Sequence, residues 1–293
     1  MNKSLRLMCV LAHPDDESLA LGGMLAKYAA EGIETSLVMA TRGERGWFRD
    51  WRAYPGERAL GALREQELRA ASEALRIARL DFLDYTDGCL DSADESEVIA
   101  KIVHLLRLVQ PHVVVTFGPD GLYGHPDHIA ISQFTTSAII CAADPSYPCA
   151  RHLAPHCVSK LYYKVASEHW FTRYMPIFGE FIMHIDGQER RAHPWVSWTI
   201  TTRVDTTAYW RAVWQAIRCH QTQIPAASVL ERISEQEHEQ LWGPQEFYRA
   251  FSLVNGGRRE ERDLFEGLNT VAANVSVPLH DKQLSYAGVE LAC

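Results

Sequence analysis

The chain has 293 residues, of which 47% are hydrophobic and 23% charged, and these ordinary values exclude a disordered, collagen-like or coiled-coil protein. A formal net charge of −8 argues against nucleic acid as a partner, because phosphate binding needs a clustered basic surface. The seven cysteines are scattered without a CxxC pair, which favours reduced thiols and a cytoplasmic location, and no run of 18 apolar residues predicts a membrane span.

Apolar runs and helical periodicity alternate along the first 165 residues. Residues 5–12 form a nearly continuous apolar run, which is typical of a strand buried on both faces, and the charged residues that follow at once argue against a signal peptide. We expect further strands at 35–41, 80–85, 112–117 and 160–165, with helices at 16–31, 58–78, 97–109 and 127–143 between them. This alternation predicts an α/β protein with a Rossmann-like, doubly wound, mostly parallel sheet and flanking helices.

The rhythm changes after residue 165. Residues 167–195 are rich in aromatic side chains and indicate an insertion, which we expect to form a lid, a subunit interface in a homo-oligomer, or a local core. A strand at 195–204, a helix at 206–220 and a last strand at 247–254 follow. We expect residues 1–255 to form a single domain and residues 256–293 to form a C-terminal tail docked on it.

Two polar clusters stand directly after predicted strands. His13-Pro14-Asp15-Asp16-Glu17 follows the first strand, and the segment 118–128, which contains His125 and His128, follows the fourth. The plain alternative for the first cluster is a solvated turn at a helix N-terminus, where acidic residues are favourable. Because ligands bind at the carboxyl edge of open α/β sheets, the two clusters together predict a metal site, and the mix of imidazole and carboxylate suits catalytic zinc.

These motifs make the sequence recognisable. AHPDDE at 12–17 and GHPDH at 124–128, with weaker matches in TRGE at 41–44, REQEL at 64–68 and AIRCHQTQ at 216–223, resemble the PIG-L/LmbE-like family of zinc-dependent N-acetylglucosaminyl deacetylases. The resemblance covers about residues 5–223. It implies an enzyme that hydrolyses the N-acetyl (N-acyl) amide of a small amino-sugar conjugate that contains N-acetylglucosamine.

The resemblance also implies roles for single residues. His13, Asp16 and His128 match the ligands of Zn²⁺, and Asp15 matches the general base for attack of a metal-activated water, with Glu17 as an alternative base. Tyr123 and His125 match positions that stabilise the oxyanion, and Asp127 is expected to orient His125.

Substrate contacts are expected from three further residues, Arg64, Asp87 and Arg42. The alternatives are a surface pair with Glu67 for Arg64 and a simple Asp-Gly turn for Asp87. Arg42 begins a loop, 42–54, whose arginine and aromatic side chains suit the rim of a sugar site or an oligomer contact.

Three other functions compete with deacetylation. An amidase would cleave a different bond of a thiol-glycoside conjugate, and a catalytically inactive sugar-binding protein would keep the fold alone. A nucleotide-binding Rossmann protein is disfavoured, because HPDDE stands where a GxGxxG loop would be needed. His220 is expected either near the pocket or as a core histidine.

Overall fold

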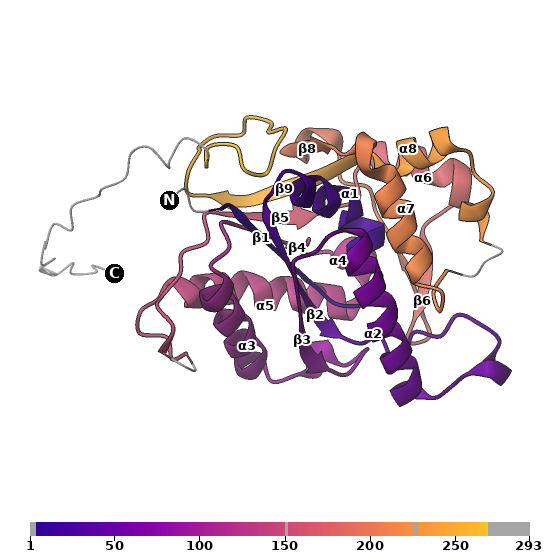
Figure 1. Cartoon of the computed structure of the whole chain (residues 1–293), viewed down its shortest axis with the longest axis horizontal. Coiled ribbons are helices and arrows are strands. Elements are labelled where there is room, and N and C mark those ends of the chain that lie inside the picture. Colours follow the sequence, from indigo (N-terminus) through magenta and orange to yellow (C-terminus); the bar gives the residue numbers. More distant parts are fainter. Residues whose placement is uncertain (1–3, 150–151, 225–227, 269–293) are drawn as a thin grey trace, which may run out of the picture.

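The computed structural model describes residues 4–149, 152–224 and 228–268 of the chain. Its centre is a seven-stranded sheet with the strand order β3-β2-β1-β4-β5-β9-β8 (Figure 1). The strands are β1 (Arg6–Leu11), β2 (Glu34–Thr41), β3 (Arg79–Tyr85), β4 (Val113–Phe117), β5 (Lys160–Lys164), β8 (Thr202–Asp205) and β9 (Pro244–Ser252). β3, β2, β1, β4 and β5 are parallel, whereas β9 and β8 are antiparallel to their neighbours. The predicted doubly wound, mostly parallel fold is confirmed.

Helices cover both faces of the sheet. They are α1 (Asp16–Ala30), α2 (Glu57–Ala74), α3 (Glu95–Val109), α4 (Gly121–Gly124), α5 (Pro126–Ala143), α6 (Glu168–Phe178), α7 (Trp210–Cys219) and α8 (Glu235–Trp242). Crossovers between parallel strands are right-handed, so α1 and α2, which lead the chain outward from β1, lie on one face, and α3 and α5 lie on the other. α7 packs on α1 and α2, and α3 packs on α5.

The region after β5 differs from the expectation in two places. The predicted strand at 195–204 is wrong for its first half, where a 3₁₀ turn at Ser197–Thr199 precedes the short strand β8. α8 was not expected, although its capping box between Ser234 and Glu237 is a readable start signal. The insertion holds α6 and a hairpin of β6 (Ile182–Ile185) and β7 (Gln188–Arg191).

The core centres on β1, whose residues 7–11 are fully buried between the two helical layers. The end of the described chain packs against this core as well. Phe265 meets the ring of Tyr28 with 5.1 Å between centroids, and the backbone N–H of Leu264 donates to the Tyr28 hydroxyl at 2.9 Å. Most of the predicted tail, residues 269–293, lies outside the described residues, and the division into domain and tail stays a prediction.

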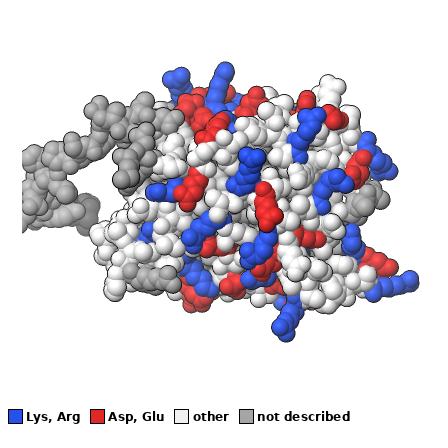
Figure 2. All heavy atoms as spheres, viewed as in Figure 1, with Lys and Arg blue, Asp and Glu red and all other residues white. Residues whose placement is uncertain are grey.

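On the face drawn in Figure 2, Lys and Arg side chains are interspersed with Asp and Glu side chains. None of the helices in the described part of the chain combines the length and apolar character needed to cross a bilayer.

Candidate metal centre and active site

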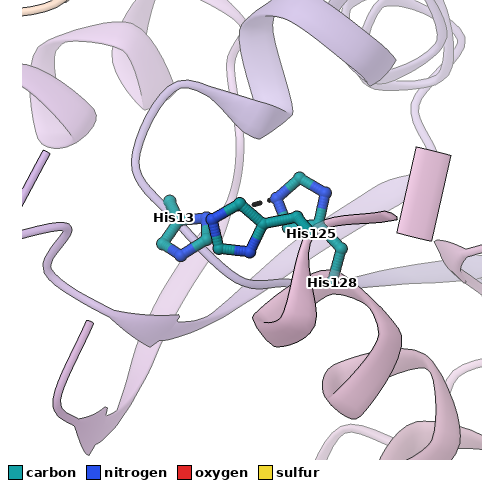
Figure 3. A group of neighbouring side chains, drawn as sticks. All are labelled: His13, His125 and His128. Carbon is teal, nitrogen blue, oxygen red and sulfur yellow. Dashed lines mark hydrogen bonds between the residues drawn. The ribbon is translucent and has the colours of Figure 1, made fainter. Parts of the chain in front are cut away.

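The two predicted polar clusters meet where the winding of the sheet reverses. β1 and β4 are adjacent parallel strands, but the chain leaves β1 toward β2 and leaves β4 toward β5, on opposite sides. Loops at such a switch point diverge and leave a crevice at the carboxyl ends of the strands. His13 stands in the loop after β1, and His125 and His128 stand at the start of α5 (Figure 3). Pro126, whose fixed φ suits the first helical turn, follows His125, which caps the helix.

Three predicted ligands form a compact buried group. The Nδ1 atom of His13 lies 3.2 Å from Nε2 of His128, although the two residues are 115 positions apart in the chain. The carboxylate of Asp16 lies 3.7 Å from Nδ1 of His13 and 3.4 Å from Nε2 of His128. Atoms bound to one zinc ion at about 2.0–2.1 Å in a tetrahedron are about 3.3–3.4 Å apart, so these spacings fit a shared ion.

The hydrogen bonds of the two imidazoles indicate that a cation belongs between them. Nδ1 of His128 faces the carbonyl oxygen of Gly121 at 3.2 Å and must therefore carry the proton. Nε2 of His13 faces the carboxylates of Asp87 at 3.1 Å and Asp127 at 3.2 Å and must carry the proton there. When both rings are neutral, the two nitrogens that face each other each present a lone pair, and one shared metal ion can bind to both. Without a metal ion, burial opposes a charge on His13, but the nearby carboxylates outweigh it and raise the pKa of His13, so a proton on its Nδ1 atom then bridges the two rings.

Burial adds to the demand for a cation. Desolvation raises the pKa of Asp16 to about 7, because its carboxylate is enclosed with little compensating charge. His125 is a further candidate ligand, since ring nitrogens of His13, His125 and His128 all lie within 4.8 Å of one another.

Asp127 and Asp87 act on His13, which differs from the expectation. Asp127 was expected to orient His125, and its backbone N–H does donate to Nδ1 of that ring at 3.1 Å. Its carboxylate, however, contacts the His13 ring and accepts the backbone N–H groups of Gly88 at 2.8 Å and Leu90 at 3.1 Å.

Burial opposes the charge of Asp87, but the hydrogen bond and charge of His13, the backbone N–H of Arg45 and the charge of Arg64 together outweigh it and lower the pKa of Asp87. The two carboxylates therefore fix the ring orientation of His13. Asp87 also lines the cavity, and its predicted contact with sugar hydroxyls stays a prediction.

Asp15 lies in the cavity beside the predicted ligands, in a strained backbone conformation. Its φ of 117° is in the left-handed region, which a non-glycine residue adopts only when its surroundings hold it there. The side chain of Glu17 accepts a hydrogen bond from the backbone N–H of Asp15 at 3.0 Å. Nη2 of Arg64 donates to the carboxylate of Asp15 at 3.2 Å. Burial raises the pKa of Asp15, and Arg64 offsets part of that shift.

Arg64 is buried against Asp15 and lines the cavity, so the suggested surface pair with Glu67 is wrong, whereas the predicted contact with sugar hydroxyls stays a prediction. Only 3% of Arg64 is exposed. Its guanidinium donates to the carbonyl oxygens of Gly43, at 2.7 Å, and Pro14, in addition to Asp15. Glu67, its suggested surface partner, instead binds Thr222. A Cβ atom at Gly43 would lie 2.2 Å from Nη1 of Arg64, so the glycine leaves room for the guanidinium.

Glu17 is enclosed rather than available for catalysis. It is fully buried, and its Oε1 atom lies 2.7 Å from Nε2 of His220, a residue of the α7 end. Ser18 donates to the same oxygen at 2.5 Å. This arrangement favours Asp15 over Glu17 as the base. It also makes His220 a buried partner of the AHPDDE motif at 12–17.

The cavity at this centre has a volume of about 580 Å³, within the range of small-molecule sites. Tyr123 and His125 lie in its wall, with Tyr123 meeting the rings of His128 and His125 edge-on at 5.3 Å and 5.8 Å between centroids. Leu122, just before Tyr123, has a φ of 69°, so the loop after β4 is held in a tight turn that presents both rings to the cavity.

Aromatic side chains from two segments complete the cavity wall. They are Trp47, Phe48 and Trp51 of the predicted rim loop, and Trp170, Tyr174, Phe178 and Phe181 of the insertion. Arg42, in contrast, does not line the cavity. Its guanidinium bonds Glu65 at 2.6 Å and Asp84 at 2.5 Å and lies 4.5 Å from the centroid of the Phe82 ring. The geometry therefore does not favour the predicted substrate contact of Arg42.

Two polar residues of the cavity were missed by sequence reasoning. Gln223 lies in the wall and donates to the carbonyl oxygen of Gly46 at 2.9 Å. Lys164 also lines the cavity, at the last position of β5. Its place at the carboxyl end of a parallel strand was a usable signal, because that edge of the sheet carries the site.

Comparisons with known proteins agree with this geometry. Residues 8–139 match the family model described as PIG-L, GlcNAc-PI de-N-acetylase. A 1D-myo-inositol 2-acetamido-2-deoxy-alpha-D-glucopyranoside deacetylase of Kineococcus radiotolerans is 33% identical over 92% of this chain and 84% of its own length.

Solved structures share the fold at lower identity. An N,N'-diacetylchitobiose deacetylase of Pyrococcus horikoshii has a TM-score of 0.61 and 20% identity over 84% of each chain. GalB, a 4-carboxy-2-hydroxymuconate hydratase of Pseudomonas putida, also has a TM-score of 0.61, with 18% identity over 86% of this chain and 99% of its own. The fold alone therefore does not fix the reaction.

Fold and site together define a doubly wound α/β protein with a candidate His/Asp metal centre at the switch point of its sheet. The similarity to the Kineococcus deacetylase over most of both chains settles the family. The chain belongs to the PIG-L family, as its two HPD motifs predicted, and the expectation of a deacetylase of this family is confirmed.

Proposed function

We propose that the protein hydrolyses the N-acetyl amide of a substrate that contains N-acetylglucosamine, releasing acetate and a free amine. The observation that carries this proposal is the pair of ring nitrogens, on His13 and His128, that face each other at 3.2 Å in one cavity with Asp15. The names of the relatives from Kineococcus and Pyrococcus, both deacetylases of N-acetylated sugars, support it.

Zn²⁺ is the proposed cofactor, held by His13, Asp16 and His128. Two imidazole nitrogens and one carboxylate suit zinc in a catalytic site. The bound ion supplies a Lewis acid that lowers the pKa of water and polarises the amide carbonyl. Asp87 and Asp127 hold the His13 ring so that its Nδ1 lone pair points into the cluster.

Asp15 is the proposed general base. Its carboxylate accepts a proton from the attacking water, and the carboxylic acid so formed gives that proton to the nitrogen as the C–N bond breaks. Burial raises the pKa of Asp15, which makes the carboxylate a stronger base. Arg64 and Glu17 hold Asp15 in place by its carboxylate and its backbone N–H.

Tyr123 and His125 are the proposed donors to the carbonyl oxygen as negative charge develops on it. Burial raises the pKa of Tyr123 well above its usual value, so its hydroxyl keeps the proton that it must donate. The Nδ1 atom of His125 accepts the backbone N–H of Asp127 at 3.1 Å, which leaves Nε2 of the neutral ring as the N–H donor.

We also infer a cytoplasmic location. Cys9, Cys89, Cys141, Cys157 and Cys219 are free thiols, which supports a reducing compartment. The homo-oligomer expected from the insertion stays a prediction. Aromatic side chains of the insertion line the cavity in this structure.

The test is acetate release by metal-loaded protein from a panel of N-acetylglucosamine conjugates, with the matching N-propionyl conjugates as a test of acyl size. We expect acetate and an equal amount of new primary amine. Cleavage of another amide without acetate would favour the amidase, and binding without any cleavage would favour a sugar-binding protein.

A further inference from the structure

Lys164 is a buried cation in the wall of the catalytic cavity. It is the last residue of β5, the strand next to β4, so it stands at the same sheet edge as the histidine cluster. Only 6% of the residue is exposed, and it lines the cavity. Its ammonium nitrogen lies 5.6 Å from the centroid of the Phe247 ring, and it forms no hydrogen bond or ion pair within the described part of the chain.

The other lysines that the structure describes behave differently. Lys101 bonds Glu97 at 2.9 Å, Lys160 bonds Glu261 at 2.6 Å, and Lys27 bonds Glu31. Each therefore has a carboxylate partner, even Lys160, which is fully buried. Lys164 is the exception among these four, and it is the one that faces the cavity.

The nearby carboxylate of Glu246 is already occupied. It accepts hydrogen bonds from Ser167 and, at 3.1 Å, from Arg203, and Arg173 lies 3.9 Å away. Nε and Nη2 of Arg173 are themselves buried without a hydrogen-bond partner among the described residues. Arg203 has a second carboxylate partner in Glu260, and Glu246 forms no hydrogen bond or ion pair with Lys164 among the described residues.

The energetics of this arrangement favour a bound anion. Burial lowers the pKa of Lys164 to about 8, and Arg173 adds to the shift while Glu246 opposes it. Burying a charge without a partner is unfavourable, so a buried ammonium in a ligand cavity indicates that the ligand supplies the opposite charge.

We propose that Lys164 binds an anionic group, a carboxylate or a phosphate, on the part of the substrate beyond the amino sugar. The proposal rests on the deacetylase function proposed above. β5 is the neighbour of β4 and neighbouring strands are about 5 Å apart, so Lys164 lines the same cavity as the histidine cluster, within reach of a group attached to the sugar. The inositol named for the Kineococcus relative is an uncharged polyol, so the proposal assigns this chain a different substrate class.

Two matched pairs of ligands test the proposal and separate the two anions. The carboxymethyl glycoside of N-acetylglucosamine is compared with its carbamoylmethyl analogue, which is neutral and of the same size. N-Acetylglucosamine 1-phosphate is compared with the methyl glycoside. Dissociation constants are measured with metal-loaded protein through tryptophan fluorescence, since Trp47 and Trp170 line the cavity, and KM and kcat are measured by acetate release.

We expect the anionic member of at least one pair to bind about 10-fold to 100-fold more tightly, the range for a hydrogen bond with a charged group. K164Q should abolish this preference. K101Q removes one positive charge from an exposed pair with Glu97 and should retain the preference. K164M, similar in length and uncharged, replaces K164Q if that variant does not fold.

Equal affinities within both pairs for the wild-type protein would overturn the proposal, and so would a preference that persists in K164Q or K164M. If the preference exists and depends on Lys164 but no conjugate yields acetate, the anion site stands and the deacetylase function fails. If acetate is released but the protein shows no preference for either anionic ligand, the deacetylase function stands and the anion site fails.

Discussion

Replacing Arg64 by alanine should lower kcat rather than raise KM. In the structure this side chain lies in the cavity wall against Asp15, and its guanidinium donates to the Asp15 carboxylate and to the carbonyl oxygens of Gly43 and Pro14. R64A leaves these acceptors without their donor. Removing one partner of a buried charged pair lowers the free energy of unfolding by about 3–5 kcal/mol. We expect the lower end of this range for R64A, because Asp15 is partly open to the cavity.

The expected loss in kcat is about 100-fold, the effect of misplacing a catalytic group by about 1 Å. Metal content should not change, since Arg64 contacts none of the three proposed ligands. R64K keeps the charge but not the planar fork, so it should recover only part of the activity.

Initial rates of acetate release, thermal unfolding and metal content measured on the same preparations separate these effects. R42A is the matched control, because Arg42 lies outside the cavity and bonds Glu65 and Asp84; its kcat and KM should match the wild type. A folded R64A protein with wild-type kcat and a raised KM would refute this reasoning and restore the sugar contact that the sequence suggested.

Three further predictions concern the base, the buried lysine and the end of the chain. D15N should bind metal as the wild type does but lose acetate release, whereas normal turnover in D15N would rule Asp15 out as the base. K164M should be more stable than the wild type at pH 7 by about 3 kcal/mol, because the folded state then carries no buried ammonium. The pKa of Lys164 is lowered from its usual 10.5 to about 8, so the free energy of unfolding of the wild type should rise as the pH increases from 8 to 10.5. The stability advantage of K164M should therefore shrink over the same range, which urea titrations at pH 7, 9 and 10 would show. A constant difference would contradict the lowered pKa, which burial causes, with Glu246 opposing the shift and Arg173 adding to it. E261Q should lower the free energy of unfolding by about 3–5 kcal/mol, because Glu261 is 1% exposed and pairs with Lys160 at 2.6 Å and Arg249 at 2.8 Å. E31Q, which breaks a surface pair with Lys27, should change the free energy of unfolding by less than about 1 kcal/mol. Equal effects of E261Q and E31Q would show that the buried pair of Glu261 contributes no more stability than a surface pair.

The sequence predicted the parallel half of the sheet well, because buried strands such as β1 (Arg6–Leu11) form nearly continuous apolar runs and the helices between them carry clear 3.6-residue periodicity. The antiparallel half was less readable. β8 is four residues long, and α8 has a weak apolar stripe, so tertiary contacts rather than local pattern decide both elements.

The candidate metal ligands were predictable for a similar reason. The motifs stand at strand ends, and the topology of parallel strands brings strand ends together. The partners of each side chain were not predictable, because they depend on packing between distant elements. The carboxylate of Asp127 pairs with His13, while only its backbone N–H bonds His125, and Arg64 reaches back to Pro14 from a helix fifty residues later. Lys164 belongs to the same class, since only its neighbours in space show that its ammonium group forms no ion pair with a described residue.

The most direct test of the central claim is the divalent metal content of purified protein after exhaustive dialysis, measured by mass spectrometry for the wild type and for H13A, H128A and H169A. His169 has a side chain 59% exposed, which makes it the control. We predict one zinc ion per chain for the wild type and for H169A, and loss of the ion from both H13A and H128A. Retention of the metal by H13A and H128A would contradict the shared ion on which the account rests.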